Sequence, residues 1–477
     1  MNTQPKPQDI LLHIPPLMWK QFRQAMLDAR QHREEVIGFF FCQRHQLSKK
    51  KVRYIPQAWV VPTADCYEHQ SASGLVLKQQ FHQYLLDTYL CALSKSSSSS
   101  KTRKLDVVHI HTHFGDATPS FSCVDDRYEA EYAKFLASCY QEKPRLISGV
   151  FNESLEKSKF RIWNRQGTNH TSIEFCRSWL TPINSNFSGE DTELIFARQK
   201  VFGETVQKHL NQLKVALIGC GGIGAVFAEQ LARLGVKNWV FIDHDRLETV
   251  NLNRMPAATQ EMVDQGWYKV HYLKWLIKRT YAIGSHVKAL SLSVEDEKAK
   301  AEIATADLIV VATDNHRSRQ VAQELALEYA RPLVCLGTHI EVKPHHQPRL
   351  YCRVTVPPLG GGWCLMCGNI INLQQAALES APTEIAAIAS EAGYLQGIDA
   401  PAVYWLNNIC ASTGVGVIHG IISGFLPIDS GLDWIYDFPN SNWLKANIDH
   451  LQSSDCYFCS SLCTLLRKER GVSLLFL

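Results

Sequence analysis

The stretch "VALIGCGGIG", residues 215–224, decides the fold of the second half of this chain. An apolar run ends there in a turn that contains Gly219, Gly221 and Gly224, and "AVFAEQLARLG" follows with helical spacing. The strand-like segment "NWVFIDHD", residues 238–245, comes next. Strand, helix and strand therefore alternate, which predicts a parallel, doubly wound α/β sheet of the Rossmann type.

The glycine-rich turn also has the chemistry of a phosphate site, because backbone N–H groups and the positive end of a helix meet there. Asp243 ends the next strand and can hold ribose hydroxyls, which fits NAD as well as ATP. Asn251 and Arg254 follow in "DHDRLETVNLNRM", and Lys269 adds another cation, so the pattern favours a triphosphate. Asp314 ends the strand "ADLIVVATDN" at the carboxyl edge of the sheet, where a carboxylate suits Mg²⁺.

This series resembles the ubiquitin-activating enzyme superfamily, which includes the thiamine and molybdopterin adenylyltransferases ThiF and MoeB. The resemblance covers roughly residues 195 to 465. It implies that ATP and Mg²⁺ are bound and that the C-terminal glycine of a ubiquitin-like protein is adenylated. By this resemblance Asp243 holds ribose, Asn251, Arg254 and Lys269 hold phosphates, and Asp314 holds Mg²⁺.

The segment "ARQKVFG" matches the lead-in of the same superfamily. The resemblance implies that Arg198 reaches the ATP of a partner subunit, and hence that the chain forms a homodimer. Met255 stands where that superfamily usually has glutamine. An NAD enzyme is the alternative reading of the glycine-rich turn.

A second group of polar residues lies in "HTHFGDATPSFSCVD", residues 111–125. Side chains two apart on a strand share a face, so His109, His111 and His113 project the same way. Asp125 lies in the first turn of a predicted helix. Two imidazoles and one carboxylate leave a fourth zinc position open for water, as in catalytic sites. The spacing selects the second and third histidines as ligands, and we interpret His109 as a structural residue.

This region resembles the JAMM (MPN+) metalloprotease family, which removes ubiquitin-like proteins and combines Glu-x-x-Gly, His-x-His and Ser-x-x-Asp. By this resemblance His111, His113 and Asp125 bind a catalytic Zn²⁺, Glu35 is the general acid-base, and Ser122 helps to stabilise the oxyanion. The gap between the second histidine and the serine is one residue longer than usual in that family. A non-catalytic member, whose histidines belong to the core, is the alternative.

Two C-x-x-C pairs, "WCLMC" with Cys364 and Cys367 and "CYFC" with Cys456 and Cys459, predict a structural Zn²⁺ site closed by four thiolates. Four unliganded cysteines are the alternative. A nucleophile for a thioester is harder to find, because the segment after the first pair has no cysteine before Cys410. Free cysteines are commonly buried, so we favour a packing role for Cys410 over a catalytic one.

At 477 residues the chain is long enough for two domains, and we expect a mixed α/β JAMM domain over 8–164, a linker over 165–191 and a ThiF-like domain over 192–477. A net charge of +3 favours neither nucleic acid nor membrane as partner. Fifteen cysteines without a secretory signal argue for a reducing compartment, and we expect the cytoplasm.

The two sites together predict a bifunctional enzyme that processes and activates the C-terminus of one ubiquitin-like protein, with a conjugating enzyme as a further partner. Such a fusion resembles prokaryotic ubiquitin-like systems, some of which stand in antiviral defence operons. One alternative is activation of a sulfur carrier for thiamine- or molybdopterin-type synthesis. Another is a degenerate JAMM scaffold that only presents the carrier.

Overall fold

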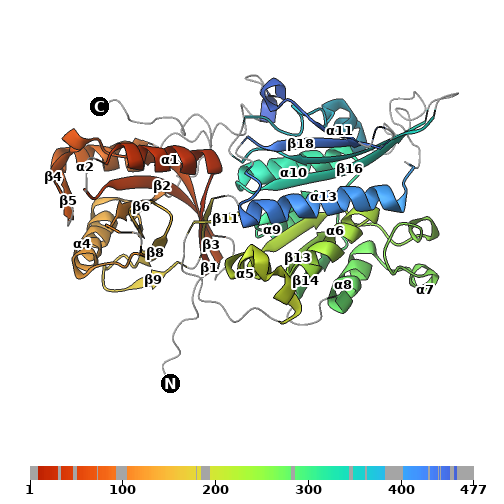
Figure 1. Ribbon diagram of the computed structural model, residues 1–477, viewed down its shortest axis with the longest axis horizontal. Helices are drawn as coiled ribbons and strands as arrows, with labels where there is room; N and C mark the ends of the chain where they lie inside the picture. Colours follow the sequence, from red (N-terminus) through yellow and green to blue (C-terminus); the bar gives the residue numbers. More distant parts are fainter. Residues whose placement is uncertain are drawn as a thin grey trace. The chain divides into compact units, whose positions relative to one another are not determined.

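The computed structural model describes a chain of two compact units, one that runs to Ser188 and one over Gly189–Thr464 (Figure 1). The residues described are 9–30, 34–46, 51–71, 74–92, 105–115, 117–173, 175–178, 180–183, 194–280, 285–342, 347–359, 362–381, 401–427, 430–438, 440, 442–451 and 456–458. Among the helices in these ranges, none has the length and apolar character needed to cross a bilayer.

The first unit is built on a nine-stranded mixed sheet with the order β11-β10-β1-β3-β2-β6-β7-β8-β9. Its strands are β1 (Asp9–Ile14), β2 (Ile37–Gln46), β3 (Lys51–Val60), β6 (Leu105–Thr112), β7 (Leu146–Phe151), β8 (Ser158–Trp163), β9 (His170–Ser172), β10 (Phe175–Ser178) and β11 (Thr181–Pro182). A hairpin of β4 (Tyr67–Ser71) and β5 (Gly74–Leu77) follows the 3₁₀ turn η1 (Ala64–Cys66). The helices are α1 (Pro16–Asp28), α2 (Gln79–Leu86), its π-helical continuation η2 (Asp87–Ala92), and α4 (Cys123–Cys139).

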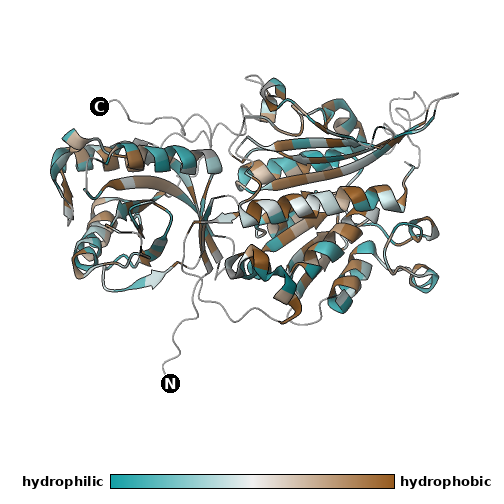
Figure 2. Ribbon diagram, viewed as in Figure 1, coloured by the Kyte–Doolittle hydropathy of each residue, from teal (hydrophilic) through white to brown (hydrophobic). Residues whose placement is uncertain are grey.

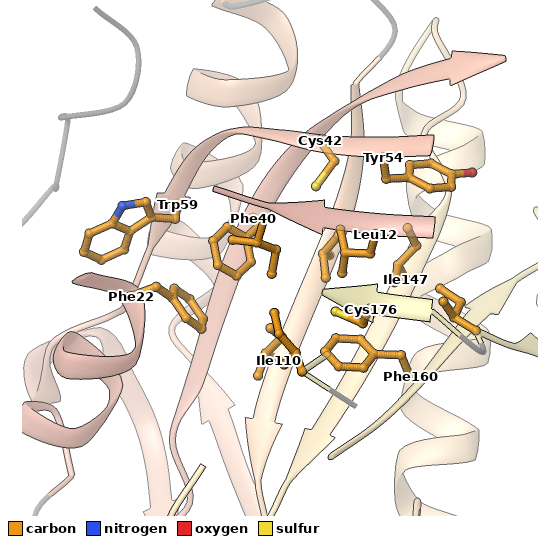
Figure 3. Close-up of a cluster of buried hydrophobic side chains, with 14 of the residues drawn as sticks. Leu12, Phe22, Phe40, Cys42, Tyr54, Trp59, Ile110, Ile147, Phe160 and Cys176 are labelled. Carbon is orange, nitrogen blue, oxygen red and sulfur yellow. The ribbon is translucent and has the colours of Figure 1, made fainter. Parts of the chain in front are cut away.

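The apolar run of β2 explains why this sheet is covered on both faces. Alternate side chains of a strand point to opposite faces. Phe40 and Cys42 join a core with Phe22 of α1 (Figure 3), whereas Phe39 and Phe41 join a core with side chains of α2 and α4. Helices therefore shield the two faces of the same central strand, and α4 is fixed against the sheet where the predicted metal ligands lie.

The structure corrects one expectation for this unit. Residues 165–191 are not simply a linker, because β9, β10 and β11 lie within them and β10 pairs in parallel with β1. Strands of two to four residues show no periodicity that a sequence could reveal. Residues 74–77 form β5, which pairs with β4, and the helical residues begin only at Gln79. The serine-rich segment 94–104 lies outside the described residues.

The second unit has an eight-stranded sheet with the order β14-β13-β12-β15-β16-β17-β18-β19. The first five are mutually parallel and confirm the predicted α/β sheet, and β17, β18 and β19 are antiparallel additions. The strands are β12 (Lys214–Ile218), β13 (Asn238–Ile242), β14 (His286–Leu290), β15 (Leu308–Val311), β16 (Leu333–Glu341), β17 (Arg349–Val356), β18 (Leu432–Asp437) and β19 (Asn442–Lys445).

Helices cover both faces of this sheet. They are α5 (Glu204–Gln212), α6 (Gly222–Arg233), α7 (Gln260–Asp264), α8 (Lys269–Thr280), α9 (Glu297–Ile303), α10 (His316–Glu328), α11 (Leu373–Glu379) and α13 (Tyr404–Ser423), with 3₁₀ segments η3 (Leu194–Phe202), η4 (Thr249–Asn251) and η5 (Ile448–Leu451). Apolar residues of α9 and α10 pack with Ala216 and Ile218 of β12, while α6 lies over Leu217 and contacts α8 and α13. Figure 2 shows hydrophobic colour along the central strands and mixed colour on the helices.

The segment 194–213, which contains the lead-in sequence, is divided between two helices. Gly203 has a φ of +97°, which no right-handed helix contains, so the 3₁₀ helix η3 ends before it and α5 begins after it. This break separates Arg198 on η3 from α5.

Candidate functional site

His111, His113 and Asp125 bring their ligand atoms together where β6 ends and α4 begins. The two histidine Nε2 atoms are 3.2 Å apart. Asp125 places Oδ1 3.3 Å from His111 Nε2 and Oδ2 3.4 Å from His113 Nε2. All three ligand atoms lie within 4.8 Å of one another. Two imidazole nitrogens and one carboxylate oxygen in this arrangement fit one zinc ion with room for a further ligand.

The N-terminus of α4 fixes the carboxylate of this group. The Ser122 hydroxyl accepts a 3.1 Å hydrogen bond from the Asp125 backbone N–H, and Asp125 Oδ2 accepts one of 2.6 Å from the Ser122 N–H. This capping box explains the Ser-x-x-Asp spacing in structural terms. The Ser122 oxygen serves as an acceptor here, so its own proton remains available to another acceptor.

The pairing of β2 with β6 brings Glu35 close to the group of His111, His113 and Asp125. Ile37 pairs with His111 in antiparallel register, and Val36 and Thr112 exchange hydrogen bonds one step further. Glu35 is consequently level with His113. Burial raises the pKa of Glu35 to about 7, with His113 opposing this shift and Asp125 adding to it. A carboxyl group that titrates near neutrality thus stands beside the three ligands, as a general acid-base requires.

The charges within the group suit a metal site. Burial lowers the pKa of His111 and favours its neutral form, which is the form that binds metals. Burial alone would raise the pKa of Asp125, but its contacts with His111 and His113 bring the pKa well below the ordinary range. The contact with Asp125 in turn raises the pKa of His113. Asp125 is therefore ionised at neutral pH.

His109 and Glu129 lie one step further along the same strand and helix. His109 Nε2 is 3.4 Å from Glu129 Oε1, and both residues form a further group with His111 whose ligand atoms lie within 4.8 Å of one another. Sequence reasoning missed Glu129. The signal was present, because Glu129 follows Asp125 by four residues and so shares its helix face.

The second unit has a cavity of about 250 Å³ at the carboxyl ends of β12, β13 and β15. It lies where doubly wound sheets bind ligands. Most of the residues selected from the sequence line it: Gly219, Gly221, Asp243, Asn251, Arg254, Lys269 and Asp314.

Three glycines shape the turn beside this cavity. Gly219 has a φ of +91°, and a Cβ there would lie 2.8 Å from the carbonyl oxygen of Ala312. Gly221 precedes α6 and has open space where a side chain would stand, so a phosphate can approach the backbone. Gly224 does not line the cavity. A Cβ on Gly224 would lie 2.1 Å from the Gly219 oxygen, so this glycine lets the helix approach the turn.

Asp243 and Lys269 form the charged side of the cavity. Asp243 accepts hydrogen bonds from the N–H groups of Cys220 at 2.8 Å and Asp245 at 2.9 Å. Burial raises the pKa of Asp243, and Lys269 opposes that shift. Lys269 Nζ lies 2.7 Å from Asp245 Oδ2. Burial lowers the pKa of Lys269, but the nearby carboxylates of Asp243 and Asp245 outweigh it, so the pKa is raised and the amine stays charged.

Asn251 and Arg254 are held by the η4 turn. Asn251 is buried, and its Oδ1 accepts a 3.1 Å hydrogen bond from the Glu248 N–H. Arg254 donates to the Val250 carbonyl oxygen and, at 3.2 Å, to Asn253 Oδ1. The turn therefore presents an amide and a guanidinium to the cavity at fixed positions.

Sequence reasoning missed other lining residues, among them Arg319, Thr338 and Asn407. Thr338 Oγ1 lies 3.2 Å from Asn407 Oδ1, which joins β16 to α13. Arg319 donates to the Thr313 carbonyl oxygen at 2.9 Å. Arg319 lies five residues after Asp314, so local spacing could have suggested it. Asn407 comes from a distant helix, and no local pattern points to it.

Two predicted roles in this unit stay predictions. Arg198 lies exposed on η3 and is not among the residues that line the cavity, and its action on a partner subunit stays a prediction. Asp314 lines the cavity, but within the described ranges it joins no group of three metal-ligating side chains. A magnesium site there would need phosphate oxygens or water as its other ligands.

Three of the four predicted zinc thiolates lie together. Cys364 Sγ is 3.8 Å from Cys367 Sγ and 3.6 Å from Cys456 Sγ. Cys459, the predicted fourth ligand, lies outside the described residues. Three converging thiols fit a structural metal site, and its closure by Cys459 stays a prediction.

The structure argues against Cys410 as a nucleophile. Its side chain has no exposed surface, and its Sγ lies 3.5 Å from the Gly337 carbonyl oxygen and 3.6 Å from that of Arg353. A hydrogen bond with Cys352, together with burial, raises the pKa of Cys410 well above its ordinary value. A buried thiol of this kind is inert, which agrees with the packing role that the sequence favours for Cys410.

Comparisons with known proteins concern the second unit. Residues 196–394 match the family model described as ThiF family. The sulfur carrier protein ThiS adenylyltransferase of Bacillus subtilis (strain 168) is 30% identical over 186 residues, which are 37% of this chain and 54% of that protein. The sulfur carrier protein adenylyltransferase of Thermus thermophilus is 30% identical over 154 residues, 31% of this chain and 55% of that protein.

A crystal structure of E. coli MccB with ATP overlaps 57% of this chain and 76% of that chain, with 19% identity and a TM-score of 0.45. The chain spans about half the length of the two curated relatives above. The family match includes the glycine-rich turn, Asp243, Asn251, Arg254, Lys269 and Asp314. The second unit therefore contains a ThiF family domain, and most of the residues that line the cavity lie within the matched range.

Proposed function

We propose that the second unit is an ATP-dependent adenylyltransferase that activates the C-terminal carboxylate of a ubiquitin-like or sulfur-carrier protein. One observation carries the proposal. The cavity of the ThiF family domain combines a glycine-rich helix N-terminus with the carboxylates Asp243 and Asp314 and the cations Arg254 and Lys269. This is the set of charges that a nucleoside triphosphate needs.

In this proposal the cavity residues contact different parts of the ATP molecule. Asp243 accepts hydrogen bonds from the ribose hydroxyls, while the N–H groups at the start of α6 receive phosphate oxygens. Arg254 and Lys269 balance the charge of the triphosphate as a carboxylate oxygen of the carrier attacks the α-phosphorus and pyrophosphate leaves. A Mg²⁺ ion held by Asp314 would add positive charge at the leaving group.

Carrier-dependent ATP–pyrophosphate exchange tests this function. We expect exchange by the full chain with a ubiquitin-like or sulfur-carrier protein that ends in glycine. Asp314→Ala should abolish it, whereas Asp264→Ala, a change on an exposed face of α7, should leave it intact. Full exchange by Asp314→Ala would refute the assignment of the ATP site.

For the first unit we propose a zinc-dependent peptidase that trims the C-terminus of the carrier or cuts the isopeptide bond after conjugation. His111, His113 and Asp125 support this by their ligand geometry, and Glu35 by its position and raised pKa. A zinc ion held there would polarise the scissile carbonyl and acidify a water molecule. Glu35 would take the proton of that water and pass it to the leaving amine, and Ser122 would donate to the developing oxyanion.

Cleavage of a carrier with a C-terminal extension tests the peptidase. Glu35→Gln should stop cleavage, and the neighbouring Glu34→Gln serves as the matched control that should still cleave. Continued cleavage by Glu35→Gln would place the peptidase activity elsewhere or remove it.

The names of the two relatives favour a second candidate, in which the carrier donates sulfur instead of being conjugated. The adenylation step is the same in both cases, and the fate of the acyl adenylate differs. Supplying the adenylated carrier with a sulfide source or with a conjugating enzyme separates the two candidates by mass spectrometry. A thiocarboxylate product supports sulfur transfer, and a carrier adduct on another protein supports conjugation.

A further inference from the structure

A contact between a histidine of β6 and a carboxylate of α4 occurs twice along these elements. His111 meets Asp125, and two residues earlier on the strand His109 meets Glu129, four residues later on the helix. Two strand residues advance about 6.6 Å and four helix residues about 6 Å, so the two spacings nearly coincide. The result is an inner group of His109, His111 and Glu129 beside the outer group of His111, His113 and Asp125.

Within the described residues, His109 Nε2 and Glu129 Oε1 are buried and make no hydrogen bond of normal geometry, and their polar contact is with each other. They face each other at 3.4 Å, on side chains that are 11% and 2% exposed. Buried polar atoms are usually hydrogen-bonded at shorter distances, so this long contact leaves both atoms weakly satisfied. A metal ion bound between them would satisfy both.

The other oxygen of Glu129 is already held. Its Oε2 accepts hydrogen bonds of 2.7 Å from Arg161 Nε and from Trp163 Nε1. Such contacts are what orients a metal-binding carboxylate from behind. Arg161 also contacts Asp126, so its positive charge is shared between two carboxylates. Oε1 is left facing the two imidazoles.

We propose that His109, His111 and Glu129 form an inner position for a divalent metal ion, which competes for His111 with the outer position of His111, His113 and Asp125. The proposal builds on the metal site of the proposed peptidase. Because one imidazole is common to both positions, the first unit holds one ion at a time. Glu35 is level with His113 and not with His109, so an ion in the inner position would be retained without supporting cleavage. His109 is then a metal ligand instead of the structural residue expected from the sequence.

The test measures metal binding and not only activity. The full-length protein is stripped of metal, reloaded with Co²⁺ and dialysed, and its bound cobalt is counted per chain. Sulfur-to-cobalt charge-transfer absorption identifies the ion of the cysteine cluster. All proteins carry His244→Ala, which breaks the group of Asp243, His244 and Asp245 in the second unit, so the remaining ion belongs to the first unit. We expect Asp125→Asn to keep that remaining ion, with a changed d–d spectrum and no cleavage, and Asp125→Asn with His109→Gln to lose it.

His109→Gln alone should keep the ion, because the outer position is intact, and Asp126→Asn in the Asp125→Asn background is a control that should also keep it. Circular dichroism confirms that each variant is folded. Loss of the ion from folded Asp125→Asn, or its retention in the double variant, would overturn the inner position. Two ions in the first unit of the wild type would overturn the competition for His111. Absence of cleavage by a wild type with one ion bound would count against the peptidase but not against the inner position.

Discussion

The carboxylate of Asp243 accepts a 2.8 Å hydrogen bond from the backbone N–H of Cys220 and so ties the end of β13 to the glycine-rich turn. The turn is held in shape by the same group that is proposed to bind ribose. Under the proposed function, the stability of the turn and the binding of ribose therefore depend on the same side chain in the second unit.

Asp243→Ala should consequently lower both the stability of the second unit and its affinity for ATP. The Cys220 N–H loses its partner, which costs about 1–3 kcal/mol in the unfolding of the second unit, as measured with denaturant. The apparent affinity for ATP should fall at least tenfold, as measured by exchange or calorimetry. Asp243→Asn retains an acceptor oxygen and should recover most of the stability but not the affinity. Equal ATP affinity in both variants and the wild type would exclude a ribose contact.

Lys269→Met should reduce exchange by about 10²-fold, because removal of one group that stabilises transition-state charge typically costs a few kcal/mol. Its ion pair with Asp245 is partly exposed, so the loss of that pair should change stability little. Lys278→Met, an exposed lysine near the end of the same helix, is the matched control. An unchanged rate in Lys269→Met would remove this lysine from the phosphate site.

Arg198 is expected to act on the ATP of a partner subunit. A mixture of Arg198→Ala and Asp314→Ala subunits should then recover part of the exchange that each variant lacks alone, because one site of the heterodimer keeps both groups. The mixture is assayed after subunit exchange has been verified with differently tagged chains. No recovery in verified heterodimers would contradict the trans arrangement.

The raised pKa of Glu35 predicts a pH-dependent stability of the metal-free first unit. The folded carboxyl binds its proton up to about pH 7, whereas the unfolded one releases it near its ordinary value of 4.5. The folded state therefore loses stability relative to the unfolded state as the pH rises from 4.5 to 7. Glu35→Gln removes this penalty. The free energy of unfolding of the variant, relative to that of the wild type, should therefore rise between pH 4.5 and pH 8, as measured by denaturant unfolding. A stability difference that is the same at both pH values would show that Glu35 is not perturbed.

The sequence predicted those features that depend on residues close together in the chain. The β12-turn-α6 unit follows from an apolar run, a glycine with positive φ and a helix start, all within 215–224. The Ser-x-x-Asp spacing is a capping box within one helical turn. Short-range geometry of this kind requires particular residue types at fixed spacings, so it can be recognised in the sequence.

The remaining features depend on contacts between distant segments. Strand β10 forms by pairing with β1, and its four residues are too few to show a strand periodicity in the sequence. Asn407 reaches the cavity from α13 through packing that no spacing encodes. The burial of Cys410 among β16 and β17 likewise follows from the tertiary fold, so sequence alone could not decide between thiol packing and catalysis.

The central claim is that one chain holds two chemically separate sites for the same carrier, and Glu35→Gln tests it most directly. On one preparation of this variant we would measure zinc content, cleavage of a C-terminally extended carrier, and carrier-dependent pyrophosphate exchange. The account predicts unchanged zinc, because His111, His113 and Asp125 remain, together with no cleavage and full exchange, because the ATP cavity lies in the other unit. Cleavage that persists, or exchange that is lost in a folded variant with its zinc, would contradict it.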